Sequence, residues 1–330
     1  MQCPGCPSEP AGPPRRFIFP PGGTARSAHG APVSVTALFD VSAPAKLNLF
    51  LHVIGRRDDG YHVLQSVFLL IDWCDTLHFE RRADGLLARH DLGTLLPDDD
   101  LCLRAARLLQ AESGISSGAD ISIDKQVPWG AGMGGGSSDA ASTLLALNRL
   151  WGLDWPLAKL LPLGLKLGAD VPFFLGGRNA WVEGIGERLT PLPIAPHRFA
   201  VVKPAAGLET RAIFADLRLV RNTDAATIEG FTAAAFGATT VGAVSLAEYC
   251  RNDLQAVAER RCPEVAQVAE WLRTHFGNSR MTGSGSAVFA SCGAEVDDPS
   301  VLAMPFELPA GWIGRMCRSL EQHPLAGWLD

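Results

Sequence analysis

The residues best suited to chemistry lie in the stretch VPWGAGMGGGSSDAASTLLALN, residues 127–148. Five glycines fall between positions 130 and 136, and Ser137, Ser138 and Asp139 follow them at the start of a strong helical pattern. Glycines let a backbone wrap closely around a ligand, and the first turn of a helix offers unpaired N–H groups to an anion. A flexible Gly/Ser linker would not open directly onto a helix. The stretch therefore predicts a cradle for a phosphate group.

Two better known phosphate motifs fit this stretch less well. Residues 130–135 satisfy the dinucleotide pattern G-x-G-x-x-G, and Asp154 lies near the expected distance of about 20 residues. However, residues 124–129 separate the glycines from the preceding strand pattern, and Asp154 stands before a Trp-Pro pair as a plausible helix N-cap. A Walker loop is excluded, because no Lys-Ser or Lys-Thr pair follows the glycines and Lys125 lies on the wrong side of them.

A phosphate loop without its own lysine takes positive charge from elsewhere in the fold, and Lys46 is the candidate. Lys46 stands in SAPAKLNLFLHVIG, residues 42–55, whose alternating pattern predicts a strand with one apolar face. Asn48 lies on the same face, about 6.6 Å along the strand. Both polar groups would then point at one place, although an edge-strand lysine that reaches solvent gives the same pattern.

The remaining patterns predict the elements that position these residues. Two apolar runs, 63–73 and 75–81, follow the first strand too closely for a crossover helix, so an antiparallel hairpin or meander is expected. Helices are predicted over 101–114, 137–152, 154–168 with an interruption at Pro162, and 263–276. Further strands are predicted over 120–128, 179–192, 198–204 and 279–292, the second and fourth as strand pairs. Strands and helices alternate without regular βαβ units, which favours the α+β class.

Length and composition indicate a globular protein with two domains. The chain has 330 residues, of which 47% are hydrophobic and 19% charged. We expect a disordered extension rich in Pro, Gly and Ala over 1–35, then domains over 36–197 and 198–330. A net charge of −6 argues against nucleic acid as a partner. No run of apolar residues is long enough to span a membrane, so a cytoplasmic location is expected.

The eight cysteines are scattered along the chain, and we expect most of them to be reduced and buried. Cys3 and Cys6 form a C-x-x-C pair, but no second pair lies at zinc-site spacing. A structural metal site is therefore not expected.

Four segments together resemble a known family. The segment PWGAGMGGGSSDA, residues 128–140, is similar to the ATP-binding motif P-x-x-x-G-L/M-G-G-G-S-S of the GHMP small-molecule kinases. Three more segments resemble the 4-diphosphocytidyl-2-C-methyl-D-erythritol kinases within that group: APAKLNLFLHVIGRRDDGYHVLQSVF at 43–68, LGADVPFF at 167–174 and TGSGSAVFA at 282–290. The similarity spans about residues 40 to 320.

The resemblance implies a fold and an activity. The fold would be two α+β domains, the first resembling ribosomal protein S5 domain 2, with the active site in the cleft between them. The activity would be transfer of the ATP γ-phosphoryl group to the 2-hydroxyl of 4-diphosphocytidyl-methylerythritol, in the non-mevalonate route to isoprenoid precursors. ATP would act with Mg²⁺, whose ligands the sequence does not identify. The only expected partner is this small-molecule substrate, and the protein would be a monomer or a weak homodimer.

The resemblance also assigns roles to residues. Lys46 and Asp170 match the catalytic pair, although Asp170 also suits the N-cap of a short helix. The ATP loop would comprise Pro128, Trp129, Gly130, Ala131, Gly132, Met133, Gly134, Gly135, Gly136, Ser137 and Ser138. Substrate contacts would come from Asn48, Tyr61, His62, Thr210, Phe214, Gly283, Ser284 and Gly285, with Tyr61 and Phe214 on the two faces of the cytosine. Without the resemblance, Tyr61 would simply pack on its own turn, and residues 282–287 would be a tight hairpin.

Three other functions compete with this interpretation. The nearest is a GHMP kinase for another small alcohol, such as mevalonate or homoserine, but the turn DDGYH at 58–62 belongs to the cytidine-binding pattern. A non-catalytic nucleotide-binding protein would not need both Lys46 and Asp170. A dinucleotide-dependent dehydrogenase is disfavoured by the misplaced strand and by the position of Asp154.

Overall fold

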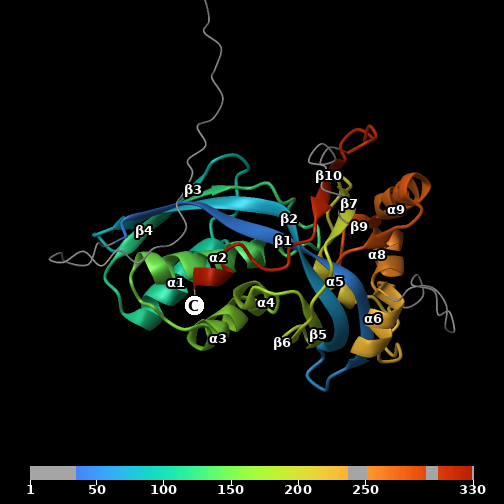
Figure 1. Cartoon of the computed structure of the whole chain (residues 1–330), viewed down its shortest axis with the longest axis horizontal. Helices are drawn as coiled ribbons and strands as arrows, with labels where there is room; N and C mark the ends of the chain where they lie inside the picture. Colours follow the sequence, from blue (N-terminus) through green and yellow to red (C-terminus); the bar gives the residue numbers. More distant parts are fainter. Residues whose placement is uncertain (1–34, 237–250, 295–303, 329–330) are drawn as a thin grey trace, which may run out of the picture. The chain divides into compact units, whose positions relative to one another are not determined.

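The computed structural model describes residues 35–236, 251–294 and 304–328, which belong to one compact unit (Figure 1). The predicted extension over 1–35, with Cys3 and Cys6, lies outside the described residues except for Val35. The described cysteines, Cys74, Cys102, Cys262, Cys292 and Cys317, are all free thiols. None of the helices within these ranges is long and apolar enough to cross a membrane.

The larger sheet is built around two long antiparallel strands, β1 (Ala37–Arg56) and β2 (His62–Arg82). Along its other edge β2 pairs with β5 (Ala180–Gly184) and with β4 (Gly118–Asp124), both antiparallel. The sheet is completed by β6 (Arg188–Pro191) and β3 (Leu87–Asp91). The predicted hairpin is confirmed, and the two apolar runs that follow the first strand form one continuous strand.

The strand β3 was not predicted, and it adds a parallel pair to this sheet. It pairs in parallel with β4, and the connection between them contains helix α1 (Leu101–Ser113). A parallel pair needs such a crossover. Helix α1 has the predicted ends, because the Asp100 carboxylate accepts a hydrogen bond from Leu103 N and Gly114 adopts a left-handed φ of 68°.

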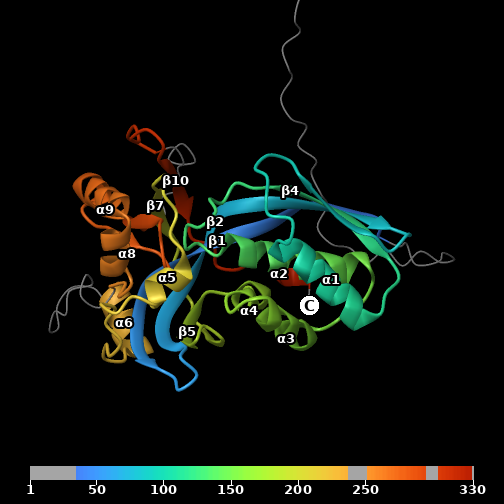
Figure 2. The same ribbon diagram turned by 180° about the vertical axis from the view of Figure 1, so that it is seen from behind.

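Helices α1, α2 (Gly135–Leu150), α3 (Leu157–Leu167) and α4 (Val171–Gly176) lie on one face of the larger sheet (Figures 1 and 2). Helix α3 continues through Pro162, where an interruption was expected. Asp154 does not cap α3, as had been considered, because the N-cap position is occupied by Pro156. The Asn148 side chain instead fixes this turn by bonding both the N–H and the C=O of Trp155.

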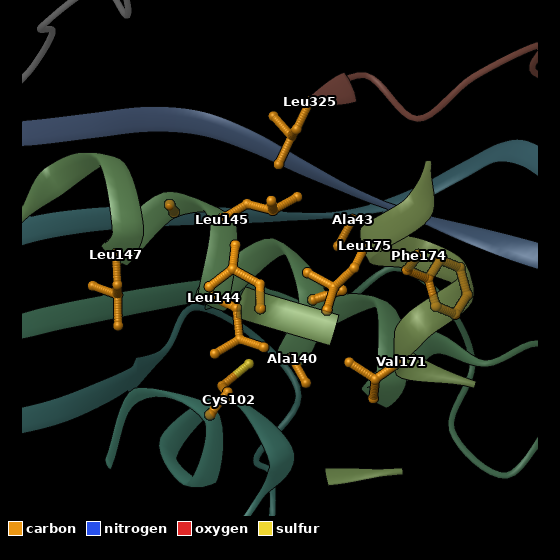
Figure 3. Close-up of a cluster of buried hydrophobic side chains, with 14 of the residues drawn as sticks. Ala43, Cys102, Ala140, Leu144, Leu145, Leu147, Val171, Phe174, Leu175 and Leu325 are labelled. Atoms are coloured by element: carbon orange, nitrogen blue, oxygen red, sulfur yellow. The ribbon is translucent and has the colours of Figure 1, made fainter. Parts of the chain in front are cut away.

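Helix α2 is buried on almost every side, which holds the glycine run at its start in place. Ala140, Leu144, Leu145 and Leu147 of α2 pack among side chains of α1, α4 and β1 (Figure 3). The other labelled residues of this cluster are Ala43, Cys102, Val171, Phe174, Leu175 and Leu325. Polar residues of α2 such as Ser142 and Thr143 are buried as well, so the helix lies within the core rather than at a surface. The loop before α2 therefore starts from a rigid element.

The smaller sheet contains β7 (His197–Lys203), β8 (Arg280–Met281), β9 (Val288–Ala294) and β10 (Ile313–Arg318), in the order β10-β7-β9-β8. All its pairs are antiparallel. Helices α8 (Gln255–Arg261) and α9 (Pro263–Phe276) lie beside it (Figures 1 and 2). The remaining short elements are α5 (Thr210–Phe214), α6 (Ile228–Phe236) and the 3-10 helix η2 (Ala326–Trp328).

Strand β1 contributes to the cores around both sheets. Leu47 and Phe50 belong to a buried cluster with Phe199 of β7, while Leu51 and Val53 belong to a second cluster with other residues of the smaller sheet. The expectation of one apolar face was therefore wrong, because the smaller sheet and its helices cover the face that would otherwise meet solvent. The predicted domain boundary near 197 falls between β6 and β7, where the chain passes from one sheet to the other, and we keep it as a proposal.

Candidate active site

A cavity of about 420 Å³ brings together most of the residues that the sequence singled out. Its lining includes the whole run from Pro128 to Ser137, together with residues of β1, β2 and α5 and of the loop between β8 and β9. The other predicted residues in the lining are Lys46, Asn48, Asp170, Thr210, Phe214, Gly283 and Ser284. Tyr61, His62, Ser138 and Gly285 do not line this cavity.

Lys46 is a buried cation rather than a lysine that reaches solvent. Only 3% of the residue is exposed, and its Nζ donates to Asn48 Oδ1 over 2.5 Å. The same Nζ lies 3.5 Å from Asp170 Oδ2 and 4.2 Å from the centre of the Phe68 ring. Burial lowers the pKa of Lys46, and the charge and hydrogen bond of Asp170 only partly offset that effect. An anion bound in this cavity would raise the pKa of Lys46 again, because it favours the charged form of the ammonium group.

Asn48 in turn is held by two neighbouring hydroxyl groups. Its Nδ2 donates to Ser66 Oγ over 2.9 Å, and its backbone N–H donates to Thr282 Oγ1 over the same distance. Thr282 is the first residue of a second glycine-containing segment, TGSGSA at 282–287, which we call the second glycine segment. Asn48 therefore connects β1 to this segment. Asn48, whose side chain accepts from Lys46, is thus held by β2 and by the loop that follows β8.

Asp170 stands immediately before α4, but its side chain makes no capping hydrogen bond there. Its carboxylate faces Lys46, and 31% of the side chain is exposed. Gly186 comes near enough that an added Cβ would lie 4.0 Å from Asp170 Oδ1. The carboxylate is thus oriented by one cation and remains accessible to a ligand, as a proton acceptor must be.

The glycine run forms the start of α2, and the helix begins at Gly135, two residues earlier than predicted. Its first intrahelical bond runs from Ser138 N to Gly134 O over 2.9 Å, so the N–H groups of residues 135–137 precede the helical ladder. Lys46 N donates to Met133 O over 3.0 Å and fixes the loop to β1. At Gly134, which has a φ of 71°, an added Cβ would lie 3.0 Å from the Phe174 ring. The loop therefore presents free backbone donors beside the Lys46 ammonium group.

The two glycine segments are joined backbone to backbone, which the sequence did not indicate. Ser286 N donates to Gly130 O over 3.2 Å, and Ala287 N donates to Ala131 O over 3.1 Å. A Cβ on Gly132 would lie 2.4 Å from the carbonyl oxygen of Thr282. Glycine is required at 132 because the two glycine segments approach each other more closely than any side chain allows. The segment 282–287, which contains the expected substrate contacts Gly283, Ser284 and Gly285, lies against the ATP-loop candidate itself.

Lys125 also lines the cavity, although it precedes the glycines. Its Nζ forms ion pairs with Asp75 and with Asp139, the latter over 2.5 Å, and all three side chains are at most 6% exposed. Burial alone would lower the pKa of Lys125, but the two carboxylates outweigh burial and raise it. Asp75 Oδ1 also accepts hydrogen bonds from the backbone N–H groups of Gln126 and Val127. These bonds hold the entrance of the loop against β2.

At another part of the cavity, Phe214 and Thr210 of α5 form the wall, and Thr210 Oγ1 lies 2.6 Å from Ser284 Oγ. The His62 ring packs against Phe214, with ring centres 5.1 Å apart and planes inclined by 33°. Tyr61 is 60% exposed, and its N–H donates to the Asp59 carboxylate within the turn. His62 therefore lies behind the wall of the cavity, and the Tyr61 ring remains available at the surface.

Comparison with known proteins places this architecture in a family. The models of the GHMP kinase N-terminal and C-terminal domains match residues 100–178 and 242–301. A 4-diphosphocytidyl-2-C-methyl-D-erythritol kinase of Methylibium petroleiphilum is 64% identical over 297 residues, which cover 90% of this chain and 99% of the relative. The chain belongs to the 4-diphosphocytidyl-2-C-methyl-D-erythritol kinase family. It is therefore an ATP-dependent small-molecule kinase with the α+β GHMP fold, and these predictions are confirmed.

Two further relatives support this family assignment. The kinase of the same name from Albidiferax ferrireducens is 58% identical over 292 residues, covering 88% of this chain and 96% of the relative. A crystal structure of a 4-(cytidine 5'-diphospho)-2C-methyl-D-erythritol kinase matches with a TM-score of 0.64 and 33% identity, covering 85% of this chain and 98% of that one.

Within the described ranges, no three His, Cys, Asp or Glu side chains come together as metal ligands would. At the start of α2, Ser138 and Asp139 are 0% and 2% exposed and do not line the cavity. Ser137 does line it.

Proposed function

We propose that this chain transfers the γ-phosphoryl group of ATP to the 2-hydroxyl of 4-diphosphocytidyl-2-C-methyl-D-erythritol, with Asp170 as the proton acceptor. Membership of the family supports the choice of substrate. The observation that carries the mechanism is the Lys46–Asp170 pair, 3.5 Å apart, in the same cavity as the glycine run. A kinase needs positioned phosphates, a cation and a proton acceptor in one place, and the cavity contains candidates for each.

In the reaction, the 2-hydroxyl oxygen of the substrate forms a bond to the γ-phosphorus of ATP. The bond from that phosphorus to the bridging oxygen breaks, and ADP leaves with the electron pair. The hydroxyl proton passes to the Asp170 carboxylate. This carboxylate suits the role because it makes no capping hydrogen bond, is partly exposed and is oriented by Lys46.

Lys46 has two tasks in this mechanism. Its ammonium group orients the Asp170 carboxylate, 3.5 Å away, and it stabilises the charge on the transferring phosphoryl group. Because burial lowers the pKa of Lys46, its charged form depends on the anions that surround it. A bound triphosphate would supply such charge and hold the ammonium group in its working state.

The start of α2 would bind the ATP phosphates through the backbone N–H groups of residues 135–137. Mg²⁺, when bound with ATP, neutralises and orients the triphosphate. Of Ser137, Ser138 and Asp139 at the start of α2, Ser137 is the one that lines the cavity, and its hydroxyl would be the candidate to contact the ion. The second segment would close on the same phosphates through Gly283 and Ser284, which line the cavity beside Gly132.

We further propose that the cytidine end of the substrate lies against Phe214, with Tyr61 folding over its other face. Phe214 lines the cavity, and Tyr61, in the turn before His62, is 60% exposed. Stacking of a base on an aromatic ring contributes about 1–3 kcal/mol. His62 packs behind Phe214 and would contribute to recognition of the base from that side.

The substrate assignment is tested by ADP release from the purified protein in a coupled assay. We expect rapid turnover with 4-diphosphocytidyl-methylerythritol, and turnover near background with mevalonate and with homoserine. Robust turnover of either simple alcohol without turnover of the cytidine compound would contradict the assignment and support a GHMP kinase of different specificity.

A further inference from the structure

Arg221 and His62 form a side-chain hydrogen bond outside the reaction centre. Arg221 Nε donates to His62 Nε2 over 2.9 Å. The other two guanidinium nitrogens donate to backbone carbonyls of one short segment, those of Phe214, Asp216 and Leu219. Arg221 therefore fixes the His62 side chain relative to the segment that carries Phe214.

This contact decides which nitrogen of His62 carries the proton. A guanidinium group only donates hydrogen bonds, and it stays charged at every pH of interest. His62 Nε2 must therefore accept, so the neutral ring carries its proton on Nδ1. Burial and the charges of Arg221 and Arg56 also lower the pKa of His62, which keeps the ring neutral in this tautomer.

The ring that carries this remaining donor lies against a wall of the cavity. The ring packs on Phe214, which together with Thr210 forms a wall of the cavity. No residue within the described ranges accepts a hydrogen bond from His62 Nδ1. A donor without an acceptor, next to an aromatic wall, suits the edge of a planar heterocycle.

We propose that Arg221 is a positioning residue for base recognition: by occupying His62 Nε2 it makes Nδ1–H the donor that meets an acceptor atom of the substrate base. The inference rests on the proposed function, in which the base is cytosine. Cytosine has acceptors at N3 and O2, whereas N3 of uracil carries a hydrogen and would oppose a second donor. A site that leaves polar groups unpaired rejects the wrong ligand strongly. Arg221 would thus contribute to the choice of cytosine over uracil.

The first test measures the tautomer directly in the wild-type protein. Histidine labelled with ¹⁵N is incorporated, and His62→Gln identifies the His62 signals by their loss. We expect a protonated Nδ1 and an unprotonated Nε2 in the neutral ring. A ring protonated on Nε2 would overturn the inference, whatever the substrate proves to be.

The second test separates base recognition from catalysis. In Arg221→Met we expect KM for the cytidine substrate to rise about 10-fold or more, while kcat changes less than about 3-fold and KM for ATP stays constant. The preference for the cytidine substrate over its uridine analogue should fall by a similar factor, and Arg221→Lys should restore part of it. Loss of the cation should also raise the pKa of His62.

Arg218→Met is the matched control, because Arg218 lies three residues away and donates its hydrogen bonds to the Asp216 carboxylate rather than to His62. It should leave KM and base preference unchanged. Equal losses in both variants, or a fall in kcat with no change in base preference, would reduce Arg221 to a structural role and refute the proposal. If the wild-type protein does not use the cytidine substrate at all, the proposed function fails instead, and the tautomer measurement still decides whether Arg221 sets the state of His62.

Discussion

Replacing Gly132 by alanine tests whether the close contact between the two glycine segments is needed for catalysis. An alanine Cβ would lie 2.4 Å from Thr282 O and 2.9 Å from Gly285 N. Since carbon atoms normally stay about 3.5 Å from such neighbours, the segments must separate by roughly 1 Å. That displacement would strain the hydrogen bonds that Ser286 and Ala287 donate to the loop.

Gly130→Ala is the matched comparison. Both glycines have a left-handed φ, 65° at Gly130 and 74° at Gly132, so both alanines incur a similar backbone penalty of about 1–2 kcal/mol. At Gly130, however, an added Cβ meets nothing within 4 Å. The difference between the two variants therefore isolates the contact between the segments.

We expect Gly132→Ala to lose about 1–3 kcal/mol more unfolding free energy than Gly130→Ala, as two hydrogen bonds weaken. Its kcat/KM should also be lower by about 100-fold, the cost that a misplacement near 1 Å can have. Urea unfolding and coupled ADP release measure the two quantities. Equal activity in the two variants would refute the idea that this contact positions the phosphates.

Three further outcomes are expected from the structure. Asp170→Asn should lower kcat by about 10²–10⁴-fold while ATP binding, followed by calorimetry, stays near normal; near-normal turnover would remove Asp170 as the proton acceptor. Lys125→Met should lower the unfolding free energy by about 3–5 kcal/mol, because it leaves the Asp75 and Asp139 carboxylates buried without their cation, and Asp139→Asn should cost less; equal losses in urea unfolding would contradict this. Burial lowers the pKa of His323 to about 4, so the unfolded state binds more protons below about pH 6.5 and stability should fall between pH 6.5 and 4 by up to about 3 kcal/mol. Urea unfolding at pH 7.5 and 4.5 should show this loss in the wild type and a smaller one in His323→Gln.

Local patterns predicted the parts of the fold that depend on neighbouring residues. The ends of α1 follow from Asp100 and Gly114, which satisfy the helix termini within one turn. The pairing of β1 with β2 follows from the short turn between them. The glycine run and its helix were found for the same reason, since the signal is contained in one continuous segment.

The features that the sequence did not predict depend on residues far apart in the chain. Lys125 meets Asp75 across 50 positions, and Arg221 meets His62 across 159. The burial of both faces of β1 depends on the smaller sheet, which begins about 140 residues later. Strand β3 is short and carries Arg89, His90 and Asp91, so it has no apolar alternation to reveal it. Such contacts are determined by tertiary packing rather than by a local pattern.

In the proposed mechanism, the Lys46–Asp170 cavity directs the ATP γ-phosphoryl group to one hydroxyl of the cytidine substrate. The most direct measurement is ³¹P NMR of the products formed by the purified protein from ATP and 4-diphosphocytidyl-methylerythritol. We predict one new phosphate monoester at the 2-oxygen, formed in an amount equal to the ADP released. Release of ADP with inorganic phosphate alone, or a phosphate ester at a different hydroxyl, would contradict the proposed geometry.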